Sequence, residues 1–305
     1  MTILLSLVAQ LLHIGLMIAA APTMAGLTDW LDARLTGRAG PPVLLPWRDL
    51  IRLSRKTPIL LESVSVVSRI APAVGLGATL SAAALVPSFC LGMALSPLAD
   101  VLVVAALLAL ARVAAALAAF DSGAAGPGLS QQRTDVLAVV AEPALMLVLV
   151  TLALMAGSFN LDLIIGQQRE GILFPAAASA VALTALLALI LADIRAPDRG
   201  AEDMFGGVDL AMLRTTRWLR HLLWIDLIGG LFLPLGMATA ETGPLPWLLG
   251  LAAWLIKLGA SIFALSGVHA MLGRIPRHGL IDLLGVAALL ALIATIMVLT
   301  SLGTA

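Results

Sequence analysis

The sequence has little charge, few aromatic residues and almost no cysteine. Only 12% of its 305 residues are charged, 61% are hydrophobic, and tyrosine is absent. This balance excludes an ordinary soluble domain and predicts a polytopic membrane protein. The single cysteine, Cys90, excludes a disulfide within the chain and a thiolate set for an iron–sulfur cluster or zinc site. We therefore expect the chain to bind no metal or cofactor of its own.

The sequence also lacks the motifs of a self-contained enzyme. It contains no Walker sequence and no Gly-x-Ser-x-Gly elbow. His13 and His269 stand alone on apolar stretches, which favours a packing role for them over a metal-ligand or proton-relay role. We expect catalysis to lie in partner proteins, and we expect no nucleic acid among the partners.

Eight apolar stretches are long enough to cross a membrane, since a transmembrane helix needs about 20 apolar residues. The predicted spans are 3–25, 70–95, 98–120, 136–158, 174–194, 217–240, 246–271 and 279–302. Lys and Arg concentrate in the odd-numbered connections, at about 26–63, 121–135, 194–216 and 272–278. The positive-inside rule places these connections in the cytoplasm and both termini outside. The predicted fold class is an all-α membrane helix bundle, formed by residues 1–305 as a single domain.

The longest polar insertion, Arg34–Lys56, is named the basic platform below. Gly and Pro residues between Gly37 and Pro46 cannot sustain a helix and predict an ordered, turn-rich loop. After it, Trp47–Lys56 places apolar residues on one helical side and Arg48, Arg52, Arg55 and Lys56 on the other. This pattern predicts an amphipathic helix on the membrane surface. Together the loop and the helix are suited to docking a partner.

The amino-acid sequence of the platform resembles that of a known family. Gly37-Arg38-x-Gly40-Pro41-Pro42 and Arg48-Asp49-Leu50-Ile51-x-Leu53-x-x-Lys56 resemble the first cytoplasmic loop of the complex I heel subunit. Counterparts of that subunit occur in energy-converting [NiFe] hydrogenases and formate hydrogenlyases, and the resemblance is closest to this hydrogenase branch. Further elements that follow the family order are Arg112 with Phe120–Gly123, Val140–Leu147, Leu231–Pro234 and Lys257. The resemblance therefore covers nearly the whole chain.

The resemblance implies a membrane subunit of a complex I-like hydrogenase or formate hydrogenlyase complex in the bacterial inner membrane. Its hydrophilic partner subunits would carry the [NiFe] and iron–sulfur centres, and antiporter-like subunits would flank it in the lipid bilayer. The platform residues implied in docking the redox arm are Arg34, Arg38, Gly40, Pro41, Arg48, Asp49, Arg52 and Lys56.

Four ionisable residues lie inside predicted spans: Arg112, Glu142, Asp226 and Lys257. Each costs about 2.5 kcal/mol or more at the centre of a membrane helix, so each needs a partner or a function. The two acids and two bases could line a proton path, or they could form static ion pairs that fix helix packing; both interpretations stay open. Pro143 weakens helical hydrogen bonding beside Glu142, which favours a functional role for that acid.

The fifth connection departs from the family pattern, in which it is acidic and is thought to link the redox arm to proton movement. Here it is short and keeps only Asp193, Arg195, Glu202 and Asp203 as remnants. Two functions therefore compete: a subunit that couples electron transfer to proton translocation, and a structural anchor without ion movement. A third, an independent secondary transporter built on Asp226 and Lys257, is disfavoured because the sequence has no inverted repeats.

Overall fold

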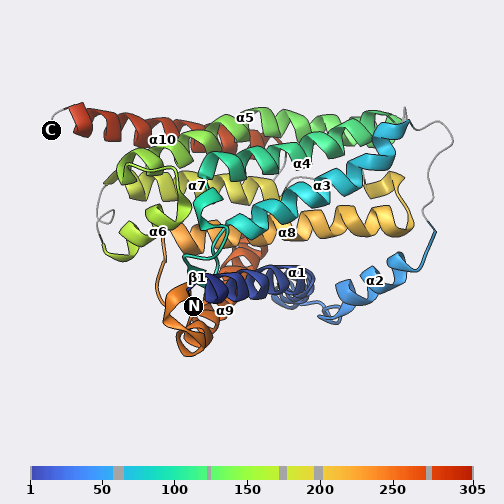
Figure 1. Ribbon diagram of the computed structural model, residues 1–305. Helices are drawn as coiled ribbons and strands as arrows, with labels where there is room; N and C mark the ends of the chain where they lie inside the picture. The colour runs from blue at the N-terminus through green and yellow to red at the C-terminus, as the bar shows by residue number, and fades with distance from the viewer. Residues whose placement is uncertain are drawn as a thin grey trace.

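The computed structural model describes residues 2–57, 65–121, 125–171, 177–195, 202–272 and 277–303. Nearly all of this is helical (Figure 1). The long helices are α1 (Thr2–Leu35), α3 (Val66–Leu85), α4 (Val101–Asp121), α5 (Ala125–Ala156), α7 (Ala177–Arg195), α8 (Gly207–Leu231), α9 (Pro244–Leu272) and α10 (Arg277–Gly303). Each overlaps one of the eight predicted spans, so the all-α bundle is confirmed.

Within the described residues, six of these helices are long and apolar enough to cross a membrane: α1, α3, α4, α5, α9 and α10. The apolar part of α7 is shorter, at Ala177–Leu191. Helix α8 is less apolar because Arg214, Arg217, Arg220 and Asp226 all lie in it. Most residues of α8 are also buried, since it packs against α1, α3, α7 and α9. Its charges therefore need partners inside the protein.

Several helices end away from the predicted boundaries. Helix α1 continues ten residues past 25, α5 occupies most of the predicted connection 121–135, and α3 stops at Leu85 where the span was expected to reach 95. Helix α8 begins at Gly207 and ends at Leu231, not over 217–240. Hydropathy marks where a helix meets lipid, whereas the helix itself ends where backbone hydrogen bonding ends. Polar residues such as those of 26–35 and 125–135 continue a helix beyond its apolar segment.

The platform has the predicted form. Helix α2 (Leu45–Ser54) follows a described loop over residues 36–44, in which Gly37 adopts a positive φ of 74°. A Cβ at Gly40 would lie 2.8 Å from Cδ1 of Trp30, so only glycine lets this loop pack against α1. The loop and the helix are thus confirmed, with α2 two residues earlier than expected, and the position of α2 on a membrane surface stays a prediction.

The platform and the C terminus lie at opposite ends of the bundle (Figure 1). At the end away from α2, the connections between helices hold one another in place. A two-stranded parallel sheet joins β1 (Cys90–Leu91) to β2 (Ala238–Thr239), and Asp100 bridges to Asn160. The short helices η1 (Ser96–Leu98), α6 (Leu161–Arg169) and η3 (Ala240–Thr242) complete this end, while η2 (Glu202–Met204) precedes α8.

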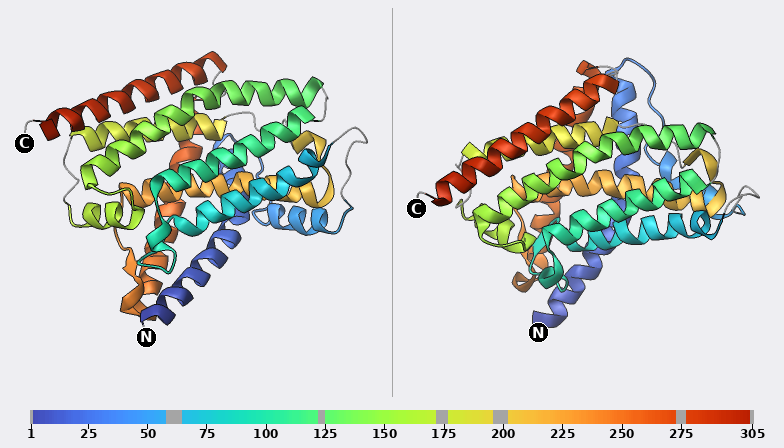
Figure 2. Two further views of the ribbon diagram at one scale, coloured as in Figure 1. Left: turned by 45° about the horizontal axis from the view of Figure 1, so that its top comes forward. Right: turned by 90° about the horizontal axis from the view of Figure 1, so that it is seen from above.

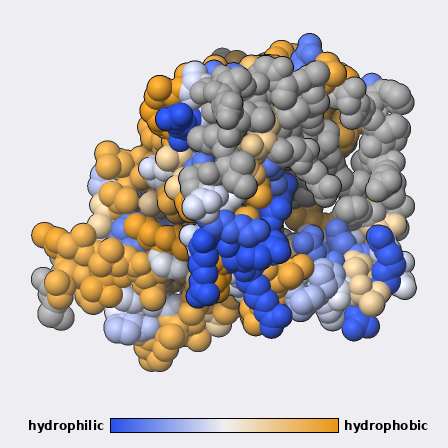
Figure 3. Space-filling view, turned by 90° about the vertical axis from the view of Figure 1, so that its right-hand side faces the viewer, coloured by the Kyte–Doolittle hydropathy of each residue, from blue (hydrophilic) through white to orange (hydrophobic). Residues whose placement is uncertain are grey.

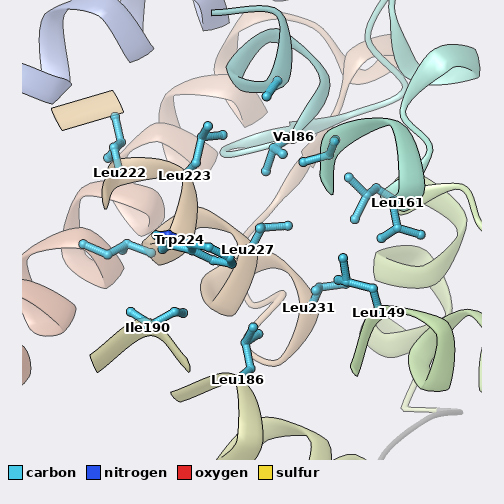
Figure 4. Close-up of a cluster of buried hydrophobic side chains, with 14 of the residues drawn as sticks. Val86, Leu149, Leu161, Leu186, Ile190, Leu222, Leu223, Trp224, Leu227 and Leu231 are labelled. Atoms are coloured by element: carbon cyan, nitrogen blue, oxygen red, sulfur yellow. The ribbon is translucent and has the colours of Figure 1, made fainter. Parts of the chain in front are cut away.

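Helix α8 supplies the centre of the apolar core. In Figure 4, Leu222, Leu223, Leu227 and Leu231 of α8 point into a cluster with side chains from α5, α6 and α7. Alanines are abundant where helices cross, which lets their backbones approach closely. Helices α1 and α9 cross the other long helices obliquely (Figure 2), and α1 contacts both α8 and α9. Helix α8 therefore contacts both the oblique pair, α1 and α9, and the helices that this pair crosses, such as α3 and α7.

Candidate functional site

The platform is joined to α8 through ion pairs. Asp49 of α2 lies 2.9 Å from Nη2 of Arg52 and 3.4 Å from Nη1 of Arg214, the first arginine of α8. Arg214 also lies 3.8 Å from Glu202 of η2, whose other carboxylate oxygen is 2.9 Å from Nη1 of Arg217. The carboxylates and guanidinium groups therefore alternate from the surface helix to the beginning of α8.

The series continues one turn further along α8. Arg220 lies 3.2 Å from the Asp193 carboxylate at the end of α7, and both side chains are at most 14% exposed. The indole of Trp224 donates a hydrogen bond of 2.8 Å to the same carboxylate oxygen. Because burial removes water from both charges, each depends on the other for stabilisation. The ion pair fixes α7 against α8.

A polar cavity of about 60 Å³ lies beside these residues, with room for more than one water molecule. Three of its lining side chains are arginines, Arg112, Arg217 and Arg220, and they come from α4 and α8. The other lining residues are Ala71, Gly75, Ala111, Ala115, Gln131, Asp135, Ala138, Glu202, Leu213 and Thr216. Gln131 donates a 2.9 Å hydrogen bond to Asp135 within α5. The cavity thus joins charged groups of α4, α5, η2 and α8.

Arg112 and Glu142 form an ion pair of 2.9 Å between α4 and α5. Arg112 is 14% exposed and Glu142 is 39% exposed, so the acid reaches the outer part of the bundle. Arg112 also lines the cavity, which places this pair beside the arginines of α8. We call the groups that run from the platform to this pair the charged series: Asp49, Arg214, Glu202, Arg217, Arg220, Asp193, Arg112 and Glu142. The structure brings together one acid and one base of the four predicted intramembrane groups.

Asp226 and Lys257 lie elsewhere. Asp226 is 12 residues after Arg214, which turns its side chain about 120° around α8 at 100° per residue. It accepts a 2.7 Å hydrogen bond from the Trp254 indole of α9. The Lys257 ammonium instead donates a 3.2 Å hydrogen bond to the Leu233 carbonyl. Among the described residues the structure records no ion pair between Asp226 and Lys257. The four predicted groups therefore form two separate sites on different sides of α8.

The platform residues divide into exposed and packed ones. Arg34, Arg38, Arg48, Arg52 and Lys56 are exposed, and Figure 3 shows hydrophilic side chains gathered on this end of the molecule. Gly40, Pro41 and Asp49 are partly buried; Gly40 packs against Trp30 of α1, and Asp49 pairs with Arg214 of α8. The Arg34 guanidinium lies 5.4 Å from the ring centroid of Trp30. Beside Arg38, a wider cavity of about 360 Å³ opens near Asp29 and Asp32.

Three predicted residues have side chains outside the described part of the structure: Arg195 at the end of α7, Asp203 in η2, and His269 in α9. His13 is fully buried, with its ring nitrogens 2.9 Å from Ser88 Oγ and 2.9 Å from the Ala83 carbonyl. Its predicted packing role is confirmed.

Sequence reasoning missed the arginines of α8 as site residues. Arg214, Arg217 and Arg220 recur every third residue, a spacing that places them near one another along a helix. That spacing was a usable signal, but the first two lay in what was expected to be a connection or a helix entry. Trp224 and Trp254 carried no such signal, because a membrane tryptophan is ordinarily an interfacial anchor.

Comparison with known proteins identifies the family. A sequence model described as NADH dehydrogenase matches residues 7–300. The chain belongs to the NADH dehydrogenase family. This confirms the resemblance carried by the platform motifs, and with the apolar helices it makes the chain a multi-pass membrane protein.

Proteins similar to this chain include two from Escherichia coli (strain K12). Formate hydrogenlyase subunit 4 is 27% identical over 286 residues, which cover 89% of this chain and 92% of the relative. Hydrogenase-4 component C is 27% identical over 243 residues, covering 73% and 74%. A subunit in the structure of an archaeal membrane-bound sulfane sulfur reductase, a respiratory membrane complex, superposes with a TM-score of 0.75 at 21% identity, covering 95% of this chain and 98% of that one. This last likeness is one of fold.

Proposed function

We propose that the chain is a membrane subunit of a complex I-like hydrogenase or formate hydrogenlyase complex in a bacterial inner membrane. In this role the basic platform seats the redox arm, and the charged series of α8 couples electron transfer to proton movement. The names of the two Escherichia coli relatives support the hydrogenase assignment. The [NiFe] and iron–sulfur centres belong to hydrophilic partner subunits, and antiporter-like subunits lie beside the chain in the bilayer.

The docking role is supported by the division of labour in the platform. Six basic side chains face outward, while Gly40 ties the segment to α1 and Asp49 ties it to α8. A rigid backbone that presents cations favours acidic partner surfaces, since electrostatic complementarity guides association. We place the platform in the cytoplasm and both termini in the periplasm, in line with the positive-inside rule.

The coupling role is supported by one observation above all: a series of charged groups leads from the platform into the helix bundle. From Asp49, ion pairs run through Arg214 and Glu202 to Arg217, and the cavity then leads to the Arg112–Glu142 pair. A displacement of Asp49 by a docked partner would change the field at each following charge. Water in the cavity could carry a proton where direct contacts end.

The test is a Glu142→Gln variant of the whole complex, purified and reconstituted in liposomes containing a pH-sensitive dye. Glutamine keeps an acceptor for Arg112 but cannot release a proton. We expect normal subunit composition and electron transfer, with proton movement per electron reduced severalfold. Glu241→Gln is the matched control, because Glu241 is an exposed acid of η3 outside the charged series. Unchanged proton movement in the Glu142 variant with normal assembly would remove Glu142 from the mechanism.

The competing function is a structural anchor without ion movement. The pairing of Arg217 with Glu202, Arg220 with Asp193 and Arg112 with Glu142 favours it, because paired charges also fix helix packing. The anchor predicts no proton movement coupled to electron transfer in wild-type liposomes. An independent transporter would instead act without partners, so ion flux by the isolated chain would identify it.

A further inference from the structure

One buried acid is left out of the charged series. Asp226 is 4% exposed, lies five residues before the end of α8, and faces α9 instead of the polar cavity. Its Oδ1 accepts the Trp254 indole hydrogen bond at 2.7 Å. Its Oδ2 is buried and has no hydrogen-bond partner among the residues that the structure describes.

This environment does not suit a permanent carboxylate. A buried negative charge requires an ion pair or several hydrogen bonds, and its uncompensated burial costs several kcal/mol. For comparison, the Asp193 carboxylate of α7 has the Arg220 guanidinium of α8 at 3.2 Å as well as an indole donor, Trp224. Asp226 has the indole donor alone, and the structure records no ion pair for it within the described ranges. A proton on Oδ2 removes the charge and explains the single hydrogen bond.

Lys257 is the nearest candidate to stabilise the ionised form. It lies one turn after Trp254 on α9, on the same side of that helix as the indole that contacts Asp226. Its ammonium group is instead held by the Leu233 carbonyl at 3.2 Å. The four-carbon stem of lysine is flexible, so the ammonium can exchange one acceptor for another.

We infer that Asp226 is a proton-binding site on the α9 side of α8, distinct from the polar cavity, and that Lys257 stabilises its deprotonated state. In the proton-bound form, Oδ2 carries the proton, Oδ1 accepts from Trp254 and Lys257 stays on Leu233. On release the O–H bond breaks, the proton passes to water, and the carboxylate attracts the Lys257 ammonium. Proton binding is thereby linked to the position of one α9 side chain, and this inference does not depend on the proposed redox coupling.

The experiment is infrared spectroscopy of the purified complex at neutral pH, recording the carboxylic acid carbonyl stretch in water and in D₂O. The difference spectrum, wild type minus the Asp226→Asn variant, should contain one positive carboxylic acid band that shifts in D₂O. Glu142→Gln is the control and should leave this band in place, because Glu142 is paired with Arg112. Lys257→Met should retain the band to more alkaline pH, by a change in proton affinity of about tenfold.

A second variant keeps the inference testable if Asp226→Asn fails to assemble. Trp254→Phe removes the hydrogen bond to Oδ1 while leaving Asp226 in place, so the band should move to higher frequency without losing intensity. Assembled Asp226→Asn with no missing band would overturn the inference, as would an unshifted spectrum in Trp254→Phe. The first result would mean that Asp226 is ionised in the resting protein, and the second that the band does not come from the carboxyl group bonded to Trp254.

Discussion

The two sides of α8 treat charge in different ways. On one side, Arg217 and Arg220 meet acids within 3.2 Å, and a polar cavity lies between the helices. On the other, Asp226 meets one indole and apolar surroundings. The first arrangement stabilises ionised groups in pairs, and the second suits an acid that binds a proton, as we infer for Asp226. One helix can therefore carry both an electrostatic connection and an isolated protonatable group.

The largest expected effect comes from breaking the ion pair at the end of α7. Arg220→Met leaves the Asp193 carboxylate buried without its cation, which costs about 3–5 kcal/mol. Thermal unfolding of the purified chain in detergent measures this loss. The double variant Asp193→Asn with Arg220→Met should recover most of the stability, because neither member of this buried pair is then charged. Equal loss in the single and double variants would show that packing, not charge, holds this pair.

A smaller effect is expected where α8 begins. Gly207 has a φ of 61°, and a Cβ there would lie 2.6 Å from the Thr57 carbonyl oxygen. Gly207→Ala should cost about 1–3 kcal/mol through backbone strain and displacement of the chain after α2. Gly77→Ala is the control, since its Cβ would meet nothing within 4 Å and alanine favours a helix. Equal unfolding temperatures in the two variants would contradict a close junction between the platform and α8.

A still smaller effect on stability is expected on the platform itself. Asp49→Asn removes the attraction to Arg52 and Arg214, and partly exposed pairs of this kind contribute about 0.2–1 kcal/mol. Its effect on partner retention should be larger than its effect on unfolding, because it frees the surface helix from α8. Co-purification of partner subunits at increasing salt measures this. Retention equal to wild type at every salt concentration would argue against Asp49 as the link.

The smallest effect is expected on the α9 side. Asp226→Asn should change the free energy of unfolding by less than about 1 kcal/mol, because a neutral acid and an amide are similar in size and both accept from Trp254. Asp193→Asn, measured in parallel by thermal unfolding, should cost clearly more because it removes the charge of a buried ion pair with Arg220. If the two variants lost stability equally, the contrast between the two sides of α8 would not hold.

Much of the fold followed from composition and spacing. The eight apolar stretches predicted the eight long helices, and the Gly- and Pro-rich run before Trp47 predicted the platform loop. Helix ends were less predictable, because residues 26–35 and 125–135 are polar enough to resemble connections but have ordinary helical hydrogen bonding. The strand pairing of Cys90 with Ala238 joins segments far apart in the sequence and has no local signal.

The candidate site was predictable only in part. The cost of charge in a membrane singled out Arg112, Glu142, Asp226 and Lys257, and the structure pairs only the first two. Which acid meets which base depends on how helices turn and cross, and sequence spacing fixes this only within one helix.

The sequence by itself determined that this protein is a helical membrane bundle of the NADH dehydrogenase family with a basic surface segment, because hydropathy and local motifs act over short stretches of chain. Only the tertiary structure decided that the charges of α8 divide into a connected series and a solitary acid. That decision depends on the packing of α8 against α7 on one side and α9 on another, which brings residues from distant parts of the chain within hydrogen-bonding distance.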